Sequence, residues 1–555
     1  MQINRHYRHI QRYRKITSVL LKQGFGYVLY QWGFLSFPGK LLFKKKPGAD
    51  QLSLAERMRM ALAELGPTFI KFGQILSTRQ DLLPPDYIHE LEKLQDEAPA
   101  FPFVLIKKLI EQELKHPLEE LFTSFDPEPL AAASIGQVHR AVLAGGQQVV
   151  VKVQRPNIEK EIETDLEILY EAARLIEKRL AWAETYSFTG LVKEFERVIH
   201  EEMNYYAEGR NADIFKRNFS GNPDVLIPTV YWEYCTRKVL TMEYLSGIKL
   251  SKFQEIERSG LSRTELALKL ADIIFKQILI DGFFHGDPHP GNIAVQPGGK
   301  IVFMDFGMVG HLNEESKNIV GDLMMALVGK DAGKVMKATL ALGMVPKGVD
   351  KKVLRMDIEL LQKKYYTVSL DQIGLREAID DIMGVVFKHH IHLLPEFALL
   401  VKALLTLEGI AQELAPGLSV VTAAEPFARK LLKERYTAPE LSKRTFKNLQ
   451  EFGETVSLLP KRVAQLLDLL HEGELGINLK VEHYYPQKEE FFNRANILIN
   501  RVAFSIVIAS LFTGSALLAG NGNFLLWNIP VAETGFVMAV VMSFLLLVSI
   551  LRSGK

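Results

Sequence analysis

Residues 285–292 read HGDPHPGN, and residues 304–307 read MDFG after an apolar run. Asp287 and Asn292 stand five positions apart, and Asp305 follows 13 positions later, which suits a short hairpin between the two motifs. Enzymes that transfer phosphoryl groups in the manner of kinases place a carboxylate that orients the nucleophile five residues before an asparagine. They hold Mg²⁺ with that asparagine and a later Asp-Phe-Gly aspartate. The spacing therefore predicts Asp287 as catalytic, and Asn292 and Asp305 as metal ligands.

A second interpretation of the same loop is a transition-metal site. His285, Asp287 and His289 alternate in a proline-rich segment, and imidazole and carboxylate groups bind such metals. This alternative leaves Asn292 and Asp305 without a role, so the phosphotransferase interpretation is favoured.

Lys152 lies toward the N-terminus in the β-branched run QVVVKV, residues 148–153. A lysine on a buried strand is costly unless it is paired. In kinases such a lysine binds the α- and β-phosphates of ATP and pairs with a glutamate on a helix. Glu208, on a helix predicted over residues 194–218, is the candidate partner and the third predicted catalytic residue. The alternative is a surface lysine at a strand edge.

The secondary-structure signals change along the chain. Gly145-Gly146 predicts a hairpin turn after a first strand, and residues 239–245 form a second β-rich patch. Residues 51–125 show helical spacing of apolar side chains, with Pro67 suited to a first helical turn. Strands followed by helices, with the chemistry at the junction, predict an α+β fold with two lobes like those of protein kinases.

The C-terminal segment contains no charged residue from Val502 to Ala532. The blocks Val502 to Gly520 and Val531 to Leu551 are each about as long as a helix that crosses a hydrocarbon core, roughly 20 residues. Residues 496–555 are therefore predicted to form a two-helix transmembrane hairpin. Basic residues flank the hairpin and are absent from its loop, which places both ends and the large soluble part on the cytoplasmic side. The alternative is a pair of buried helices in a soluble core.

The first 50 residues are basic and aromatic. No acidic residue precedes Asp50, whereas ten lysines and arginines do, and a net charge of +2 for the whole chain does not itself indicate nucleic acid. A basic, aromatic arm suits an anionic membrane surface, and the alternatives are a solvated tail or an RNA-binding arm. The single cysteine, Cys235, excludes a disulfide framework and fits a reducing compartment. Membrane lipid, but no nucleic acid, is the expected partner.

Three further segments resemble the UbiB/AarF/ADCK family of atypical kinases: AAASIGQVH at residues 131–139, VKVQRP at 151–156 and KFGQ at 71–74. The resemblance covers roughly residues 50–440. It implies that an alanine-rich loop replaces the usual glycine-rich nucleotide loop. The nucleotide-binding residues that follow from it are Ala131, Ala132, Ala133, Ser134, Gly136 and Lys152, with Glu243 and Leu245 at the adenine hinge.

The resemblance also implies a regulatory helix over the active site, where a protein substrate would otherwise dock. Its Lys-x-Gly-Gln element contains Lys71, Gly73 and Gln74. The family's Glu-x-Asp element falls at Glu202 and Asn204, so an asparagine stands where the family has aspartate. We expect Asn204 and Glu208, four positions apart, to share one helix face.

The family implies an ATPase-like enzyme that uses ATP and Mg²⁺ and supports the synthesis of ubiquinone-like isoprenoid lipids. Expected partners are an isoprenoid quinone precursor, quinone-biosynthesis enzymes and, as an open option, a second copy of the chain. The expected location is a bacterial-type inner membrane, with several membrane passes. Two alternatives stay open: a small-molecule or lipid phosphotransferase, as in aminoglycoside and choline kinases, and a non-catalytic scaffold that responds to ATP.

The predicted domains divide the chain into six parts. They are an N-terminal arm (1–50), a helical extension (51–125), an N-lobe (126–245), a C-lobe (246–440), a helical connector (441–495) and the transmembrane hairpin (496–555).

Overall fold

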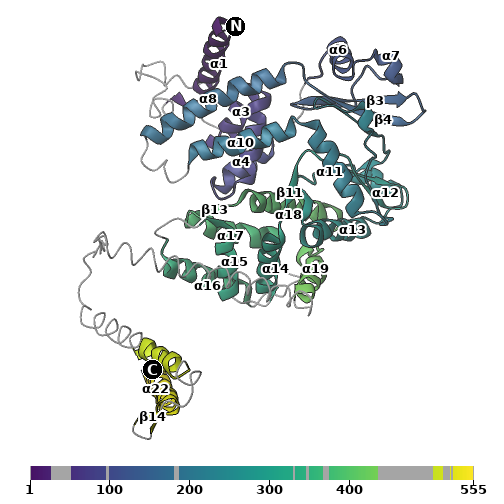
Figure 1. The fold of residues 1–555 in the computed structure, drawn as a ribbon. Helices are drawn as coiled ribbons and strands as arrows, with labels where there is room; N and C mark the ends of the chain where they lie inside the picture. Colours follow the sequence, from purple (N-terminus) through teal and green to yellow (C-terminus); the bar gives the residue numbers. More distant parts are fainter. Residues whose placement is uncertain are drawn as a thin grey trace. The chain divides into compact units, whose positions relative to one another are not determined.

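The computed structural model describes most of the chain. The described residues are 2–26, 52–94, 99–179, 187–328, 332–344, 349–366, 374–435, 504–516, 525–526 and 529–553. The chain divides into two compact units, Met1–Phe446 and Lys447–Lys555 (Figure 1). The predicted connector at 441–495 and the second half of the N-terminal arm lie outside the described residues.

The N-lobe contains an antiparallel sheet in the order β1–β3–β4–β6, with β2 paired to β3. Its strands are β1 (Phe122–Phe125), β2 (Ala131–Ala132), β3 (Gly136–Leu143), β4 (Gln148–Gln154) and β6 (Val239–Glu243). Val149, Val151 and Val153 are fully buried on one face of β4, so the side chain of Lys152 lies on the other face. The predicted turn is confirmed, and Gly146 has a φ of 82°, which glycine adopts without strain.

Helices precede and follow the first strands. One layer contains α1 (Gln2–Lys22), α3 (Leu54–Leu65), α4 (Pro67–Thr78), α5 (Pro85–Glu92), α8 (Ile158–Arg179) and α10 (Phe188–Glu202). The helices α6 (Phe103–Leu114) and α7 (Leu118–Leu121) instead pack against the sheet. Ser53 caps α3 reciprocally with Glu56, and Pro67 begins α4 as predicted. Figure 1 shows α3, α4, α8 and α10 side by side.

Helix α1 comprises the first half of the predicted basic arm and packs on the protein. Arg12 forms an ion pair at 2.6 Å with the fully buried Asp165 of α8, and Lys22 pairs at 2.5 Å with Glu64 of α3. The charges of Arg12 and Lys22 therefore neutralise carboxylates of this chain.

The helix predicted over residues 194–218 is two helices, so that prediction is wrong. Helix α10 ends at Glu202, and α11 (Tyr205–Asn218) starts after Asn204, whose φ of −102° and ψ of 87° are not helical. The backbone N–H of Tyr205 donates to the carbonyl of Arg237 at 3.1 Å, which fixes the break. Asn204 precedes the helix that carries Glu208, so the predicted shared helix face is wrong as well.

The C-lobe places both predicted motifs at strand ends. One sheet has the order β5 (Val225–Leu226), β10 (Lys300–Phe303), β9 (Ile293–Gln296) and β7 (Ile248–Lys249). A second, two-stranded ladder pairs β8 (Phe283–His285) with β11 (Val309–His311). Residues 286–292 connect β8 to β9, and MDFG follows β10, so the two sheets bring the motifs together.

The remaining C-lobe elements are mostly helical. They are α12 (Phe253–Arg258), α13 (Arg263–Phe275), the π-helix η4 (Lys276–Asp281), α14 (Glu314–Val328), α15 (Ala332–Ala341), α16 (Lys351–Tyr366), α17 (Leu375–Lys388), α18 (Pro395–Leu414) and α19 (Val420–Arg435). The short strands β12 (Gly343–Met344) and β13 (His392–Leu393) pair with each other.

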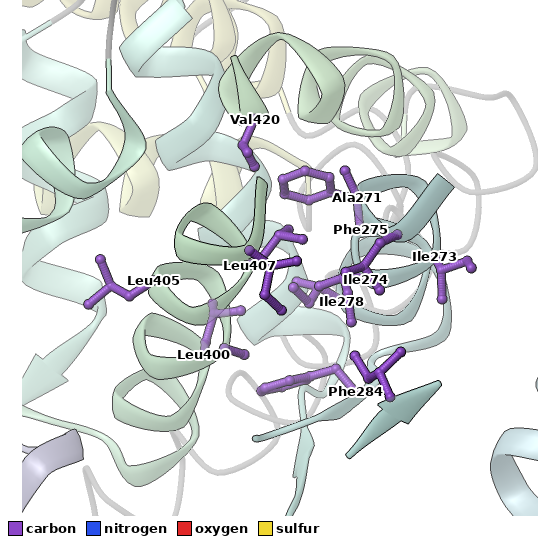
Figure 2. Packing of buried hydrophobic residues seen from close by; sticks show 14 of the residues in the cluster. Ala271, Ile273, Ile274, Phe275, Ile278, Phe284, Leu400, Leu405, Leu407 and Val420 are labelled. Carbon is purple, nitrogen blue, oxygen red and sulfur yellow. The ribbon is translucent and has the colours of Figure 1, made fainter. Parts of the chain in front are cut away.

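The C-lobe core lies between α13, η4 and α18. Ile274, Phe284 and Leu407 are fully buried, and Figure 2 shows them facing one another from three different elements. Fully burying a side chain of this size contributes about 1.5–3 kcal/mol. This packing fixes α18 beside β8, and therefore beside the start of the HGDPHPGN loop.

The second unit contains helical residues 504–516, the short strands β14 (Leu525–Leu526) and β15 (Ile529–Pro530), and α22 (Val531–Ser553). The rings of Phe512 and Phe536 pack edge to face at 5.3 Å. Within the part of the chain that the structure describes, no helix is long and apolar enough to cross a membrane. The predicted transmembrane hairpin therefore has no support from the described residues.

Candidate active site

The centre of the site is Lys152, which extends from β4. Its Nζ donates to both carboxylate oxygens of Glu208 on α11, at 2.7 and 2.8 Å, and to Oδ2 of Asp305 at 3.0 Å. The ammonium also lies 5.3 Å from the centre of the Tyr205 ring. The structure thus brings together three residues that the sequence singled out, from three separate elements.

The site has one ammonium group and two carboxylates, so its negative groups outnumber its positive one. Burial raises the pKa of Glu208 to about 7, and Lys152 only partly offsets it. Burial acts in the same direction on Asp305, but Lys152 and the backbone N–H of Gly307 lower the pKa of Asp305 well below its usual value. Burial would lower the pKa of Lys152, yet the two carboxylates hold it well above its usual value. The charged forms of Lys152 and Asp305 are therefore favoured.

The HGDPHPGN loop is held by hydrogen bonds to its neighbours. Asn292 accepts from the backbone N–H of Met304 through its carbonyl at 3.0 Å, which ties the loop to the MDFG segment. The Asn292 side chain donates from Nδ2 to the carbonyl of Asp287 at 3.4 Å. These bonds hold Asp287, Asn292 and Asp305 in one region, as the spacing predicted.

His285 has no free ring nitrogen for a metal. Its Nε2 lies 2.8 Å from the carbonyl of Asp305, and its Nδ1 accepts from the backbone N–H of Asp287 at 3.1 Å. Burial lowers the pKa of His285, which favours the neutral ring that this pairing requires. Among the described residues, no group of three or more His, Cys, Asp or Glu side chains is arranged to hold a metal ion. The transition-metal alternative is therefore wrong for His285.

Asn292 and Asp305 fit the requirements of Mg²⁺. Asp305 keeps an ionised carboxylate whose side chain is 38% exposed, and Asn292 uses its amide nitrogen within the protein, so the amide oxygen is available as a ligand. Mg²⁺ in phosphate-binding sites typically takes one or two protein carboxylates and completes its shell with phosphate and water. The donor set suits that ion.

The alanine-rich segment forms a tight hairpin. Ala131 and Ala132 pair with Val138 and Gln137 on β3, and the N–H of Ala133 donates to the carbonyl of Gly136 at 2.8 Å. Ser134 is buried. A side chain at position 136 would approach the hydroxyl of Tyr205 to 2.2 Å, so only glycine fits there. The predicted nucleotide loop thus lies on Tyr205, beside Lys152.

The predicted hinge residues end β6. The carboxylate of Glu243 accepts from the N–H and the hydroxyl of Thr229 at 3.1 and 2.7 Å, so this side chain is used within the protein. Leu245 is half-buried. A nucleotide at this edge would meet backbone groups of residues 243–245.

The Lys-x-Gly-Gln element lies on α4. Lys71 is buried, and its Nζ lies 2.6 Å from Glu202 at the end of α10. Gln74 donates to the carbonyl of Leu94 at 3.1 Å. A side chain at Gly73 would approach Leu94 to 2.3 Å, so this glycine allows α4 to pack closely.

Asn204 follows Glu202 in the break between α10 and α11. Its Oδ1 is buried without a hydrogen-bond partner among the described residues. The structure brings Lys71 and Glu202 together as the resemblance implied, while Gln74 holds the backbone after α5. The regulatory roles of these residues stay predictions.

Besides Tyr205, two residues of this site were missed by the sequence reasoning. Lys402, on α18, lies 3.3 Å from Oδ2 of Asp287, and Gln277, on the π-helix η4, accepts from the backbone N–H of His285 at 3.0 Å through Oε1. π-helices are often found at functional sites. Gln277 has no sequence signal of its own. Lys402 gave only a weak signal, a lone lysine in the apolar run of residues 397–407.

The two-lobed fold and the contacts of Lys152 with Glu208 and Asp305 define a kinase-like protein. The family models agree. The chain matches an ABC1 atypical kinase-like domain over residues 93–339, a UbiB helical domain over 358–419 and an ABC1/UbiB kinase-like C-terminal domain over 486–552.

Curated relatives agree with these models. The chain is 35% identical to a probable protein kinase UbiB of Marinobacter nauticus, over 78% of this chain and 81% of that protein. It is 33% identical to the chloroplastic protein ACTIVITY OF BC1 COMPLEX KINASE 7 of Arabidopsis thaliana, over 92% of this chain and 73% of that protein. The protein therefore belongs to the ABC1/UbiB family of atypical kinase-like proteins.

A solved structure of a Mycobacterium tuberculosis protein in complex with erythromycin is also similar. It shares 24% sequence identity and a TM-score of 0.40, and the match covers 62% of this chain and 92% of that chain.

Proposed function

We propose that this protein binds Mg²⁺-ATP and transfers the terminal phosphoryl group to water or to an acceptor, as an atypical kinase or ATPase. The observation that carries the proposal is the position of Lys152, which bonds to Glu208 and Asp305 at once. Kinases need this lysine–glutamate pair and the metal-binding aspartate in place together. A half-buried cation held by two carboxylates supports that arrangement.

Each residue has a defined part in the proposal. Lys152 binds the phosphates, and Asn292 and Asp305 hold Mg²⁺, which supplies neutralisation of the phosphate charge when it is bound. Asp287 orients the nucleophile. Lys402 holds the Asp287 carboxylate from outside the loop, at 3.3 Å, and so positions it.

The residues around the nucleotide complete the proposed site. The hairpin at residues 131–136 covers the nucleotide, and the backbone of residues 243–245 receives the adenine. These roles rest on the place of both segments beside Lys152 on the sheet: β2 pairs with β3, and β6 pairs with β4.

The experiment that tests this function is ADP release by the purified protein and by Asp305→Asn. The variant keeps the shape of Asp305 and removes the metal-binding charge, so we expect turnover to fall about 100-fold or more. Asp86→Asn, at an exposed position on α5, is the matched control and should keep the parental rate. Parental turnover in Asp305→Asn would show that Asp305 is not a metal ligand.

We further propose that this activity supports the synthesis of a ubiquinone-like isoprenoid lipid, with a quinone precursor or its biosynthetic enzymes as partners. The similarity to a protein named UbiB supports this. ADP release should change when a quinone-precursor lipid is added. An identical rate over the full solubility range of the lipid would argue against a quinone precursor as the ligand.

We also propose that the C-terminal unit associates with a membrane, with the kinase-like unit on the cytoplasmic side. Several large apolar side chains of this unit are exposed, among them Phe504, Ile506, Phe536, Val537 and Phe544. Such a surface suits a membrane or a partner protein. Deleting residues 496–555 should move the protein to the soluble fraction. If the shortened protein still needs detergent for extraction, this unit is not the anchor.

A further inference from the structure

A cavity of about 580 Å³ lies within the helical layer, between α1, α3, α4, α8 and α10. Its wall is almost entirely aliphatic and aromatic, and among the described lining residues Tyr13 and Thr17, both on α1, have side-chain hydroxyls. Representative lining residues are Leu20, Leu65, Phe69, Phe72, Leu169 and Val192. The cavity is separate from the groups around Lys152.

The size of this cavity calls for an occupant. Protein interiors are close-packed, with few voids larger than a water molecule, and empty apolar space destabilises a fold. Small-molecule sites usually measure about 300–1,000 Å³ and are mostly apolar. Taking roughly 30 Å³ for each heavy atom, as for liquid water, the cavity has room for a chain of about 20 carbons.

Arg57, beside the cavity, indicates the charge of the ligand. Its guanidinium lies 5.9 Å from the ring centre of Phe25, which lines the cavity. Its Nη1 donates to the carbonyl of Gln23 at 3.4 Å, and its Nε is buried without a hydrogen-bond partner. Within the described ranges, no carboxylate forms an ion pair with Arg57. A half-buried arginine in this state favours an anionic group, to which it can form charge-assisted hydrogen bonds.

We infer that the helical layer binds a single-chain amphiphile, with its acyl or prenyl chain in the cavity and an anionic head group at Arg57. The carboxylate of a fatty acid and the phosphate of a lipid would present the same chemistry to this arginine. The inference does not depend on ATP turnover, because neither the cavity nor Arg57 is part of the proposed nucleotide site.

The test of the cavity is binding of cis-parinaric acid, a fluorescent fatty acid, to the full-length protein in phosphatidylcholine nanodiscs, with empty nanodiscs subtracted. Thr17→Phe fills the cavity from a half-buried position on α1, whereas the neighbouring Ser18→Phe adds the same side chain at an exposed position. We expect Thr17→Phe to weaken binding about tenfold or more and Ser18→Phe to leave it unchanged. The probe should also raise the melting temperature of the parent and of Ser18→Phe only.

Equal binding by the parent and Thr17→Phe would overturn the cavity site. Absence of saturable binding to the parent would overturn it too, because the cavity would then be closed to added ligands, for example by the chain itself. The melting temperature of each variant without probe separates a folding defect from a filled cavity. If Thr17→Phe does not fold, Ala172→Phe, from a half-buried position on α8, takes its place.

The test of the head group is competition by oleic acid, oleyl phosphate and oleyl alcohol. Against the parent, we expect at least one of the two anions to compete about tenfold better than the alcohol. The stronger anion identifies the head as carboxylate or phosphate. Arg57→Gln should remove the advantage of the anions and keep the affinity for the alcohol. Equal competition by all three ligands against the parent would overturn the assignment of the head group to Arg57.

Discussion

Lys152, which is half-buried, and Lys71, which is buried, each contact a glutamate, but their surroundings differ. Lys152 contacts two carboxylates, those of Glu208 and Asp305, and the Asp305 side chain is 38% exposed. Lys71 pairs with Glu202 at 2.6 Å, between α4 and α10, and both of these side chains are largely covered. The first lysine thus lies in a group with excess negative charge, and the second joins α4 to α10.

The difference indicates different roles. A group of one ammonium and two carboxylates has a net negative charge. A divalent cation can therefore bind it without breaking the lysine–glutamate contact. The pair of Lys71 and Glu202 instead holds α4 against α10, the helix that ends just before the start of α11. Charges of both groups act on Tyr205. Burial raises its pKa, and so do the charges of Glu202 and Glu208.

The largest effect is expected for Lys152→Met. The change removes the phosphate-binding cation and leaves Glu208 buried without its partner, so ATP affinity should fall about 100-fold or more and stability by about 3 kcal/mol. Isothermal titration calorimetry and urea unfolding measure the two effects. The double variant Lys152→Met/Glu208→Gln should recover most of the stability and none of the affinity. If it recovers neither, burial of Glu208 is not the source of the loss.

A smaller effect is expected for Lys71→Ala. Loss of this pair should cost about 1–2 kcal/mol and leave the fold intact. ATP turnover or nucleotide preference should change severalfold, because Lys71 contacts the helix that leads into the site. Lys22→Ala, which breaks the more exposed pair with Glu64, is the control and should change neither. Radiolabelled ATP measures phosphoryl transfer to added proteins. We expect no substantial labelling of added proteins by the parent or by Lys71→Ala. Strong labelling of added proteins by the parent would contradict a covered active site.

The parts of the site that could be predicted from sequence have a local signal, either a short spacing or a charge in an apolar run. Asp287 and Asn292 belong to one loop, and Asp305 follows a short hairpin, so their spacing alone limits where they can lie. Lys152 was recognisable because a charged residue in a β-branched run needs a partner. Glu208 was found through that requirement.

The parts that could not be predicted depend on contacts between distant segments. The break before Tyr205 has no glycine or proline to mark it and is fixed by a hydrogen bond to the carbonyl of Arg237. Lys402 approaches Asp287 from a helix far along the chain, and only the packing of α18 against α13 brings it there. The cavity behind α4 likewise arises where five helices meet, so no single helix predicts it.

A further effect is the pH dependence of stability at Glu208. Burial raises the pKa of this carboxyl from its ordinary value of 4.5 to about 7 in the folded protein, so between these values the folded state binds more protons than the unfolded state. The contribution of Glu208 is therefore fully present below pH 4.5 and is lost as the pH rises through 7. It amounts to about 3 kcal/mol at most.

His139 and His285 have lowered pKa values in the folded protein, so their contribution to stability rises with pH up to about 6.5. Over that part of the range they act opposite to Glu208. The useful quantity is therefore the difference in unfolding free energy between the parent and Glu208→Gln, in which both histidines cancel. Urea unfolding from pH 5 to 8 should show the parent losing stability relative to Glu208→Gln as the pH rises. A difference that stays constant with pH would mean that Lys152 keeps Glu208 ionised throughout. In that case the group around Lys152 would keep its excess negative charge over this whole pH range.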